Sequence, residues 1–171
     1  MKRKTHSISI MSLEAITELL SSKKTLYNIV SIRSTDLPEL EYKVFEDFKG
    51  HYKEIIIEVF DDIESPWTGK KVVDPKQIAG ILNWAKGKNN IVVHCTAGIS
   101  RSAAVAYLIA CTRMIPAEAV KILKTDSHYP NDLVVYYGAK ILGDDSIYTE
   151  YYRWLDKADE ACEDRFSDND G

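Results

Sequence analysis

Residues Ile91 to Tyr107 read IVVHCTAGISRSAAVAY, and the rest of the chain can be placed around them. The three β-branched residues before His94 predict a short strand that is buried on both faces. The small and apolar residues after Ser102 predict a helix that its neighbours bury. A strand, a loop and a helix in this order direct backbone N–H groups and the positive end of the helix dipole at one point. The sequence therefore predicts an anion-binding loop over residues 95–101.

The side chains of this anion-binding loop suit a tetrahedral oxyanion. Arg101 can donate two parallel hydrogen bonds to two phosphate oxygens. Gly98 lets the backbone turn sharply and approach a ligand closely. Cys95 lies where N–H dipoles and a guanidinium stabilise a thiolate, which is a nucleophile, and Ser102 can donate a hydrogen bond to that sulfur when it leaves. The residues expected to surround the anion are Thr96, Ala97, Gly98, Ile99, Ser100 and Arg101.

The pattern His-Cys, five residues, Arg-Ser resembles the signature loop of the cysteine-based protein tyrosine phosphatases. The variant from Ala97 to Ser102 is most similar to the small dual-specificity branch. Four fixed residues recur by chance in about one chain in a thousand of this length, so the pattern is specific. The competing interpretation is an ordinary strand–helix turn with a buried cysteine. The resemblance implies a metal-independent phosphatase with Cys95 as nucleophile, and no cofactor is expected because Arg101 and the backbone neutralise the phosphate.

Displacing an alkoxide or phenolate from phosphorus needs an acid that protonates the departing oxygen. In the resembled family this acid is an Asp on a loop roughly thirty residues before the Cys. Asp61 and Asp62 lie 34 and 33 residues before Cys95, directly after a predicted strand. The Phe-Asp-Asp-Ile context is similar to phosphatases in which the second Asp serves, so we expect Asp62 to be the acid and keep Asp61 as the alternative. The tryptophan-led loop motif of the larger tyrosine phosphatases is absent, which leaves the identity of the acid open.

Two further residues are expected to support the loop. His94 precedes the nucleophile and is expected to tune the loop through hydrogen bonds rather than to act as a base. Asn131 follows a Pro, as does an Asn that braces the loop in the resembled family. A plain helix cap explains Asn131 equally well.

The remaining chain predicts a single α/β domain over residues 1–171, with a mostly parallel central sheet flanked by helices. Strands are expected over 6–11, 26–33, 53–60 and from 91. A helix is expected to follow Ser12, and another to run from Asp36 to Gly50 with Leu40 on its buried face. Further helices are expected over 75–87, 102–114, 117–124, 131–142 and 147–162. Residues 163–171 are expected to form a frayed acidic tail.

Composition narrows the class of protein. The chain has 171 residues with 45% hydrophobic and 28% charged residues, as is ordinary for one soluble domain. The net charge is −4, and the stretch from Asp156 to Gly171 carries seven acids and two bases, so no basic face suggests nucleic acid. No apolar run reaches membrane-spanning length and no signal peptide is evident. Three scattered cysteines predict a reducing, cytoplasmic setting. We expect a monomer without a nucleic-acid or membrane partner and without a bound metal.

The sequence is less informative about the substrate. Residues Thr96, Ala97, Ile99 and Ser100 are uncharged, which disfavours substrates with several phosphates, such as phosphoinositides. We therefore expect a phosphorylated protein or peptide, with phosphotyrosine first and phosphoserine or phosphothreonine as further substrates. The alternatives are a phosphatase of phosphoinositides or of a small phosphorylated metabolite, a non-catalytic phosphoprotein-binding module, and an unrelated thiol enzyme such as a sulfurtransferase or an arsenate reductase.

Overall fold

A four-stranded parallel sheet organises the molecule. The computed structural model describes residues 7–167, with side chains described as far as residue 161. The strands are β1 (Ile8–Ser12), β2 (Asn28–Arg33), β3 (Glu54–Val59) and β4 (Ile91–Cys95), and their order across the sheet is β1-β4-β2-β3. Every neighbouring pair is parallel. All five residues of β4 are buried, as its run of β-branched residues predicts. The expected start of the first strand, His6, lies outside the described residues.

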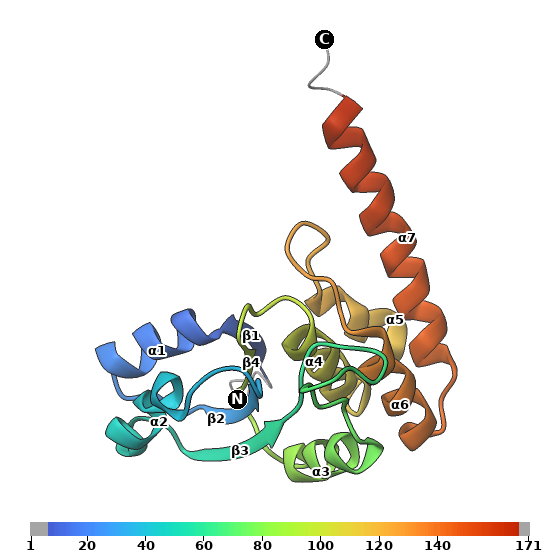
Figure 1. Ribbon diagram of the computed structural model, residues 1–171. Helices are drawn as coiled ribbons and strands as arrows, with labels where there is room; N and C mark the ends of the chain where they lie inside the picture. Colours follow the sequence, from blue (N-terminus) through green and yellow to red (C-terminus); the bar gives the residue numbers. More distant parts are fainter. Residues whose placement is uncertain (1–6, 168–171) are drawn as a thin grey trace.

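The two faces of the sheet are covered by different helices (Figure 1). On β2 and β4, Ile29 and Val92 pack into a core with α1 (Leu13–Ser22) and α2 (Val44–Asp47). The alternate residues Val30 and Val93 pack into the larger core on the other face. This alternation follows from the two-residue period of a strand. The predicted α/β sandwich with a parallel central sheet is therefore confirmed.

The larger core is built around α4 (Arg101–Cys111), whose residues Arg101 to Ala110 are all buried. Helix α4 packs on β4 and contacts α3 (Pro75–Ala85), α5 (Pro116–Ala119) and α6 (Asp132–Leu142). Its alanines let the neighbouring elements approach closely, so the helix behind the anion-binding loop is held from all sides. Short 3-10 turns complete the chain at η1 (Glu39–Tyr42), η2 (Lys49–His51) and η3 (Val120–Ile122).

The helix predicted from Asp36 to Gly50 is wrong as a continuous element. The segment forms η1, α2 and η2 instead, and Leu40 is 73% exposed rather than in the core. Tyr42 takes the buried position, where its hydroxyl accepts a hydrogen bond from the N–H of Ser34 (3.1 Å) and its ring lies under the Arg33 guanidinium. The tighter 3-10 turn changes the spacing of the buried face, which the 3.6-residue period did not anticipate. Likewise, the helix expected over 117–124 is divided into α5 and η3.

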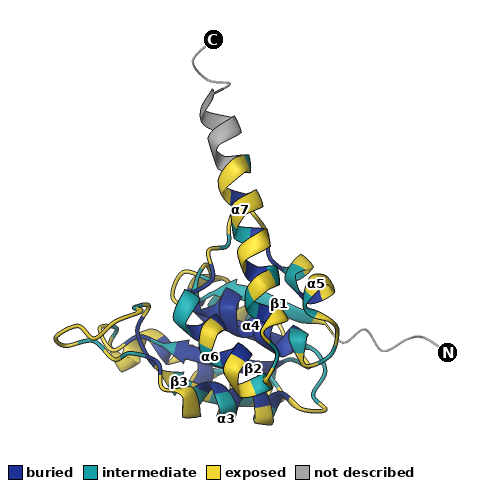
Figure 2. Ribbon diagram, turned by 90° about the vertical axis from the view of Figure 1, so that its right-hand side faces the viewer, coloured by how far each residue is buried: buried dark blue, intermediate teal, exposed yellow. Residues whose placement is uncertain are grey.

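The last helix, α7 (Ser146–Ser167), extends away from the rest of the molecule (Figure 2). Its buried residues Ile147, Tyr151, Trp154 and Ala158 recur every three or four positions and join the larger core. The helix continues to Ser167, past the end expected at Cys162, and residues 168–171 of the expected acidic tail lie outside the described part. Nowhere between residues 7 and 167 is a helix both long and apolar enough to cross a membrane.

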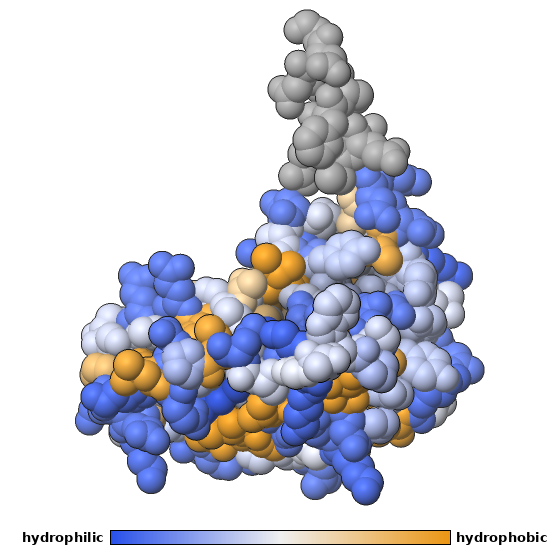
Figure 3. All heavy atoms as spheres, viewed as in Figure 1, coloured by the Kyte–Doolittle hydropathy of each residue, from blue (hydrophilic) through white to orange (hydrophobic). Residues whose placement is uncertain are grey.

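Strand β3 forms one edge of the sheet, where Ile57 is 45% exposed and Val59 is 37% exposed. Hydrophobic atoms are visible along the lower edge of the face in Figure 3, in the region of β3 and α3. The carboxyl ends of β2, β3 and β4 lie at the same end of the sheet, because all the strands run in the same direction. The residues that follow these three strands therefore meet at one place.

Candidate active site

The anion-binding loop connects the carboxyl end of β4 to the first turn of α4 (Figure 1). Gly98 has φ +71°, and a Cβ at this position would lie 2.6 Å from the backbone N of Ser12 and 2.7 Å from the carbonyl carbon of Met11. Only glycine fits this conformation and this contact without displacing backbone. The carbonyl oxygen of Thr96 accepts a hydrogen bond from the N–H of Leu13 (3.1 Å). The loop is thus held against the junction of β1 and α1.

The sulfur of Cys95 lies at the floor of this loop, and the residue is only 2% exposed. The N–H of Gly98 donates a hydrogen bond to Sγ (3.3 Å), and Oγ of Ser102 lies 3.1 Å from Sγ. Helix α4 begins at Arg101, so its positive end also points towards this region. The Gly98 N–H and the positive end of α4 are groups of the kind that stabilise negative charge on a sulfur.

The guanidinium of Arg101 is held in place by groups from three strand ends. Its Nη1 donates to Oγ of Ser34 (2.8 Å) and to the carbonyl oxygen of Phe60 (2.9 Å), and its Nη2 donates to Oγ1 of Thr96 (3.2 Å). The side chain is 5% exposed, and Nε is buried without a hydrogen-bond partner among the described residues. A buried charged donor without an acceptor is costly, so this geometry favours an anion beside the loop.

The two candidate acids face opposite ways. Asp61 is 3% exposed, and its carboxylate accepts hydrogen bonds from the N–H and hydroxyl of Thr35 and from the N–H of Lys71. Burial raises the pKa of Asp61, but these three hydrogen bonds outweigh burial and hold the pKa below its ordinary value. Asp61 therefore ties the 61–73 loop to the end of β2 as a carboxylate.

Asp62 is exposed and contacts the anion-binding loop. Its Oδ1 accepts hydrogen bonds from Oγ of Ser100 (2.7 Å) and from Nδ2 of Asn131 (2.9 Å). Oδ2 has no hydrogen-bond partner in the described part of the chain, so it can contact another molecule. Of the two aspartates, the structure brings only Asp62 to the loop.

Asn131 combines the two roles that the sequence left open. Its Oδ1 accepts from the N–H of Val134 (3.1 Å) and caps α6, while its Nδ2 holds Asp62. Its own N–H donates to the carbonyl oxygen of Ser100 (3.3 Å), and the N–H of Tyr129 donates to the carbonyl oxygen of Ile99 (3.0 Å). The segment before α6 therefore supports both the anion-binding loop and Asp62.

His94 is fully buried beneath the loop. Its Nε2 lies 2.8 Å from Oγ of Ser31, its Nδ1 lies 3.4 Å from the carbonyl oxygen of Cys95, and its ring stacks on Phe45 with centroids 5.1 Å apart. Burial lowers the pKa of His94 to about 4, helped by the charges of Arg33 and Arg101. A neutral imidazole in this position supports the backbone and has no contact with solvent.

No protein-family model matches the sequence, and no curated protein sequence matches it. Solved structures do. PTPMT1 in complex with PI(5)P superposes with a TM-score of 0.50 and 14% identity, over 82% of this chain and 96% of that chain. The chain has the fold of the cysteine-based protein tyrosine phosphatases. Tk-PTP in its active form superposes with a TM-score of 0.49 and 16% identity, over 82% of this chain and 97% of that chain. A human tyrosine phosphatase-like serine/threonine/tyrosine-interacting protein superposes with a TM-score of 0.46 and 17% identity, over 72% of this chain and 79% of that chain. Because identities this low concern the fold alone, the chemistry is argued from the residues of the site.

Sequence analysis missed the residues that hold Arg101 and His94. Ser31 and Ser34 belong to β2 or follow it, and the carbonyl oxygen of Phe60 follows β3. A signal was present, because polar residues at the carboxyl ends of parallel strands adjoin the site in such sheets. In the described part of the chain, no three His, Cys, Asp or Glu side chains gather as a metal site would require.

Proposed function

We propose that this chain is a cysteine-dependent protein phosphatase that hydrolyses phosphotyrosine and also accepts phosphoserine and phosphothreonine. The observation that carries the proposal is the buried Nε of Arg101, which lacks an acceptor among the described residues, in the same loop as the buried Cys95. A phosphate between the guanidinium and the loop N–H groups supplies that acceptor and places phosphorus next to the thiolate. The fold of the cysteine-based phosphatases supports the same chemistry.

In the first step, the Cys95 thiolate attacks phosphorus, and the bond between phosphorus and the substrate oxygen breaks. Arg101 and the loop N–H groups neutralise the charge on the phosphoryl oxygens. Asp62 donates its proton to the departing oxygen, which leaves as an alcohol or a phenol. Ser100 and Asn131 hold Oδ1 of Asp62, so its free Oδ2 is the atom assigned to proton transfer.

In the second step, a water molecule attacks the phosphocysteine. The Asp62 carboxylate accepts a proton from that water, and the bond between sulfur and phosphorus breaks to release inorganic phosphate. The departing thiolate is stabilised by the hydrogen bond from Gly98 and by the hydroxyl of Ser102, which lies 3.1 Å from the sulfur. The protons and charges balance without a metal or a co-reactant.

A protein substrate is supported by the residues at the rim of the loop. Thr96, Ala97 and Ile99 are exposed and uncharged, so no side-chain cation of the loop other than Arg101 is available for a second phosphate. The alternative is a phosphoinositide phosphatase. An intact set of Cys95, Arg101 and Asp62 also argues against a module that only binds phosphoproteins.

The test compares wild type with Cys95→Ser and Arg101→Lys on an aryl phosphate and on a phosphotyrosine peptide. Cys95→Ser is expected to abolish turnover and still bind the phosphopeptide, because the hydrogen bonds to phosphate do not need the sulfur. Arg101→Lys is expected to lose both turnover and binding, since lysine cannot donate in parallel. Full activity of Cys95→Ser would refute the nucleophile. Faster turnover of a phosphatidylinositol monophosphate in vesicles than of any peptide would favour the lipid alternative.

A further inference from the structure

A groove runs between α1 and the segment 37–44, and it reaches the anion-binding loop. Its volume is about 720 Å³, and Thr96 of the loop is among the residues that line it. Oγ1 of Thr96 accepts the hydrogen bond from Nη2 of Arg101, so the groove lies one side chain away from the guanidinium. Figure 1 shows α1 and α2 side by side at this end of the molecule. A substrate held at Cys95 by its phosphate therefore has its flanking residues close to this groove.

The charged side chains that line the groove are all acidic. Glu14 and Glu18 lie one helical turn apart on α1, and Glu41 lies across from them in η1. All three are exposed, and none of them has an ion-pair partner in the part of the chain that the structure describes. The neighbouring Lys43 is already paired with Asp47 (3.5 Å). We call this surface the acidic groove.

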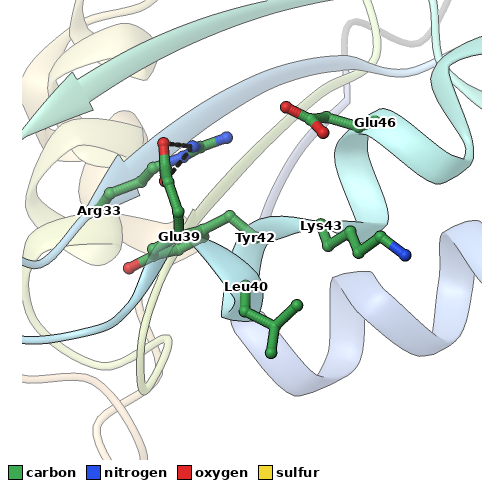
Figure 4. A pocket seen from close by; sticks show the side chains of 6 residues that line it. All are labelled: Arg33, Glu39, Leu40, Tyr42, Lys43 and Glu46. Carbon is green, nitrogen blue, oxygen red and sulfur yellow. Dashed lines mark hydrogen bonds and ion pairs between the residues drawn. The ribbon is translucent and has the colours of Figure 1, made fainter.

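The rest of the acidic groove is largely apolar. Leu13, Leu37, Leu40 and Val44 contribute aliphatic surface to it. Leu40 is 73% exposed, although sequence periodicity predicts it in the core. A second cavity of about 310 Å³ shares Leu40 with the acidic groove. Figure 4 shows that Glu39 pairs with Arg33 in this cavity and that Leu40 points away from the pair. The groove therefore combines aliphatic surface with three unpaired carboxylates, which together complement a segment that carries both a cation and an aliphatic side chain.

We infer that the acidic groove binds the part of a phosphoprotein substrate that flanks the phosphorylated residue, and that it selects segments carrying Lys or Arg together with an aliphatic residue. This inference rests on the proposed phosphatase function and adds the substrate class. Unpaired carboxylates attract a basic segment, whereas they repel an anionic lipid surface. Every substrate is held at Arg101 by its phosphate, and the acidic groove distinguishes substrates by the residues that flank the phosphorylated one.

The test uses phosphotyrosine peptides that differ only in their flanks. One set carries Lys and Leu before the phosphotyrosine, another carries them after it, and a third carries Gln and Leu. Wild type is expected to prefer one basic set over the Gln set by roughly 5- to 30-fold in kcat/KM, since each exposed ion pair contributes modestly. The preference should fall as ionic strength rises. The variant Glu14→Gln/Glu18→Gln/Glu41→Gln is expected to lose the preference and to keep its activity on a small aryl phosphate.

A matched control removes the same charge elsewhere. The variant Asp156→Asn/Asp159→Asn/Glu160→Gln changes three exposed acids on α7, and it should keep the peptide preference. Equal kcat/KM for all peptide sets, or equal loss of preference in both variants, would overturn the inference. Binding of the same peptides to Cys95→Ser reports on the acidic groove even if turnover is absent, so the two proposals fail separately. Faster hydrolysis of anionic vesicles than of any peptide by the wild type would also overturn the inference, because the unpaired carboxylates are expected to repel such a surface.

Discussion

Acidification below pH 6.5 should destabilise the folded chain through His94. An unfolded histidine has a pKa near 6.5, whereas burial beneath the anion-binding loop lowers the pKa of His94 to about 4. Above pH 6.5 both states carry a neutral imidazole, so this residue adds no pH dependence. As the pH falls below 6.5, the imidazole becomes protonated in the unfolded state but stays neutral in the folded state, so the free energy of unfolding decreases. The loss ends near pH 4, where the folded imidazole also becomes charged.

The size of the effect follows from the two pKa values. Each pKa unit is worth about 1.4 kcal/mol, so the difference between 6.5 and about 4 corresponds to a loss of about 3 kcal/mol in the free energy of unfolding. That is a large share of the ~5–15 kcal/mol by which domains are stable. Asp61 acts at lower pH, because its stabilising contribution is lost as the pH falls from the ordinary aspartate pKa to the lowered pKa of the folded state.

The assay is urea unfolding at several pH values between 7.5 and 4, followed by tryptophan fluorescence, on wild type and on His94→Gln. Glutamine cannot titrate and can still hydrogen bond to Ser31, so the variant should have a smaller slope than wild type between pH 6.5 and 4 whatever its absolute stability. The slope that remains includes His128, whose pKa burial also lowers. His94→Asn serves as a second variant if His94→Gln does not fold. Parallel curves for wild type and variant over this range would refute a neutral, buried His94.

Three further outcomes are expected. Asp62→Asn should lower kcat/KM about 10²–10⁴-fold on phosphopeptides and less on nitrophenyl phosphate, whose leaving group needs little protonation. Asp61→Asn should instead lower the urea midpoint, and its small loss of kcat/KM should not depend on the leaving group. If the two variants exchange these behaviours, the acid is Asp61. Gly98→Ala should lower the free energy of unfolding by at least about 1 kcal/mol because of its left-handed φ, and it should displace the loop from Ser12. Phosphate binding measured by calorimetry should therefore be lost, and unchanged binding would contradict the geometry. Iodoacetate at mildly acidic pH should label Cys95, with phosphate protecting it, and spare Cys111, whose pKa burial raises to about 12; equal labelling of both in peptide mapping would contradict a stabilised thiolate.

The sequence was sufficient for the parts of the fold that local rules determine. The apolar run of β4 and the small residues of α4 predicted a buried strand and a buried helix, and both are present. A helix was expected to follow Ser12, and a helix cap was one of two interpretations of Asn131; both side chains accept a backbone hydrogen bond in the first turn of a helix. These features depend on residues a few positions apart, which is why sequence patterns reveal them.

The parts that sequence did not predict depend on contacts between distant residues. The break of the 36–50 segment arises because Tyr42 fills a position against Ser34 and Arg33, and periodicity alone placed Leu40 there. The hydrogen bond from Arg101 to the carbonyl oxygen of Phe60 joins residues 41 positions apart and involves no side chain of Phe60. No residue type marks such a partner in the sequence.

The geometry of the 61–73 loop explains why two adjacent aspartates are present. Both residues follow the end of β3, and Asp61 turns towards Thr35 and Lys71, whereas Asp62, in the bend that comes next, turns towards Ser100 and Asn131. The first aspartate holds the backbone, and the second keeps one oxygen free at the mouth of the anion-binding loop. Exchanging their roles would require the loop to rotate and would break three hydrogen bonds to Asp61. The position of the proposed acid is therefore a consequence of the fixed position of its neighbour.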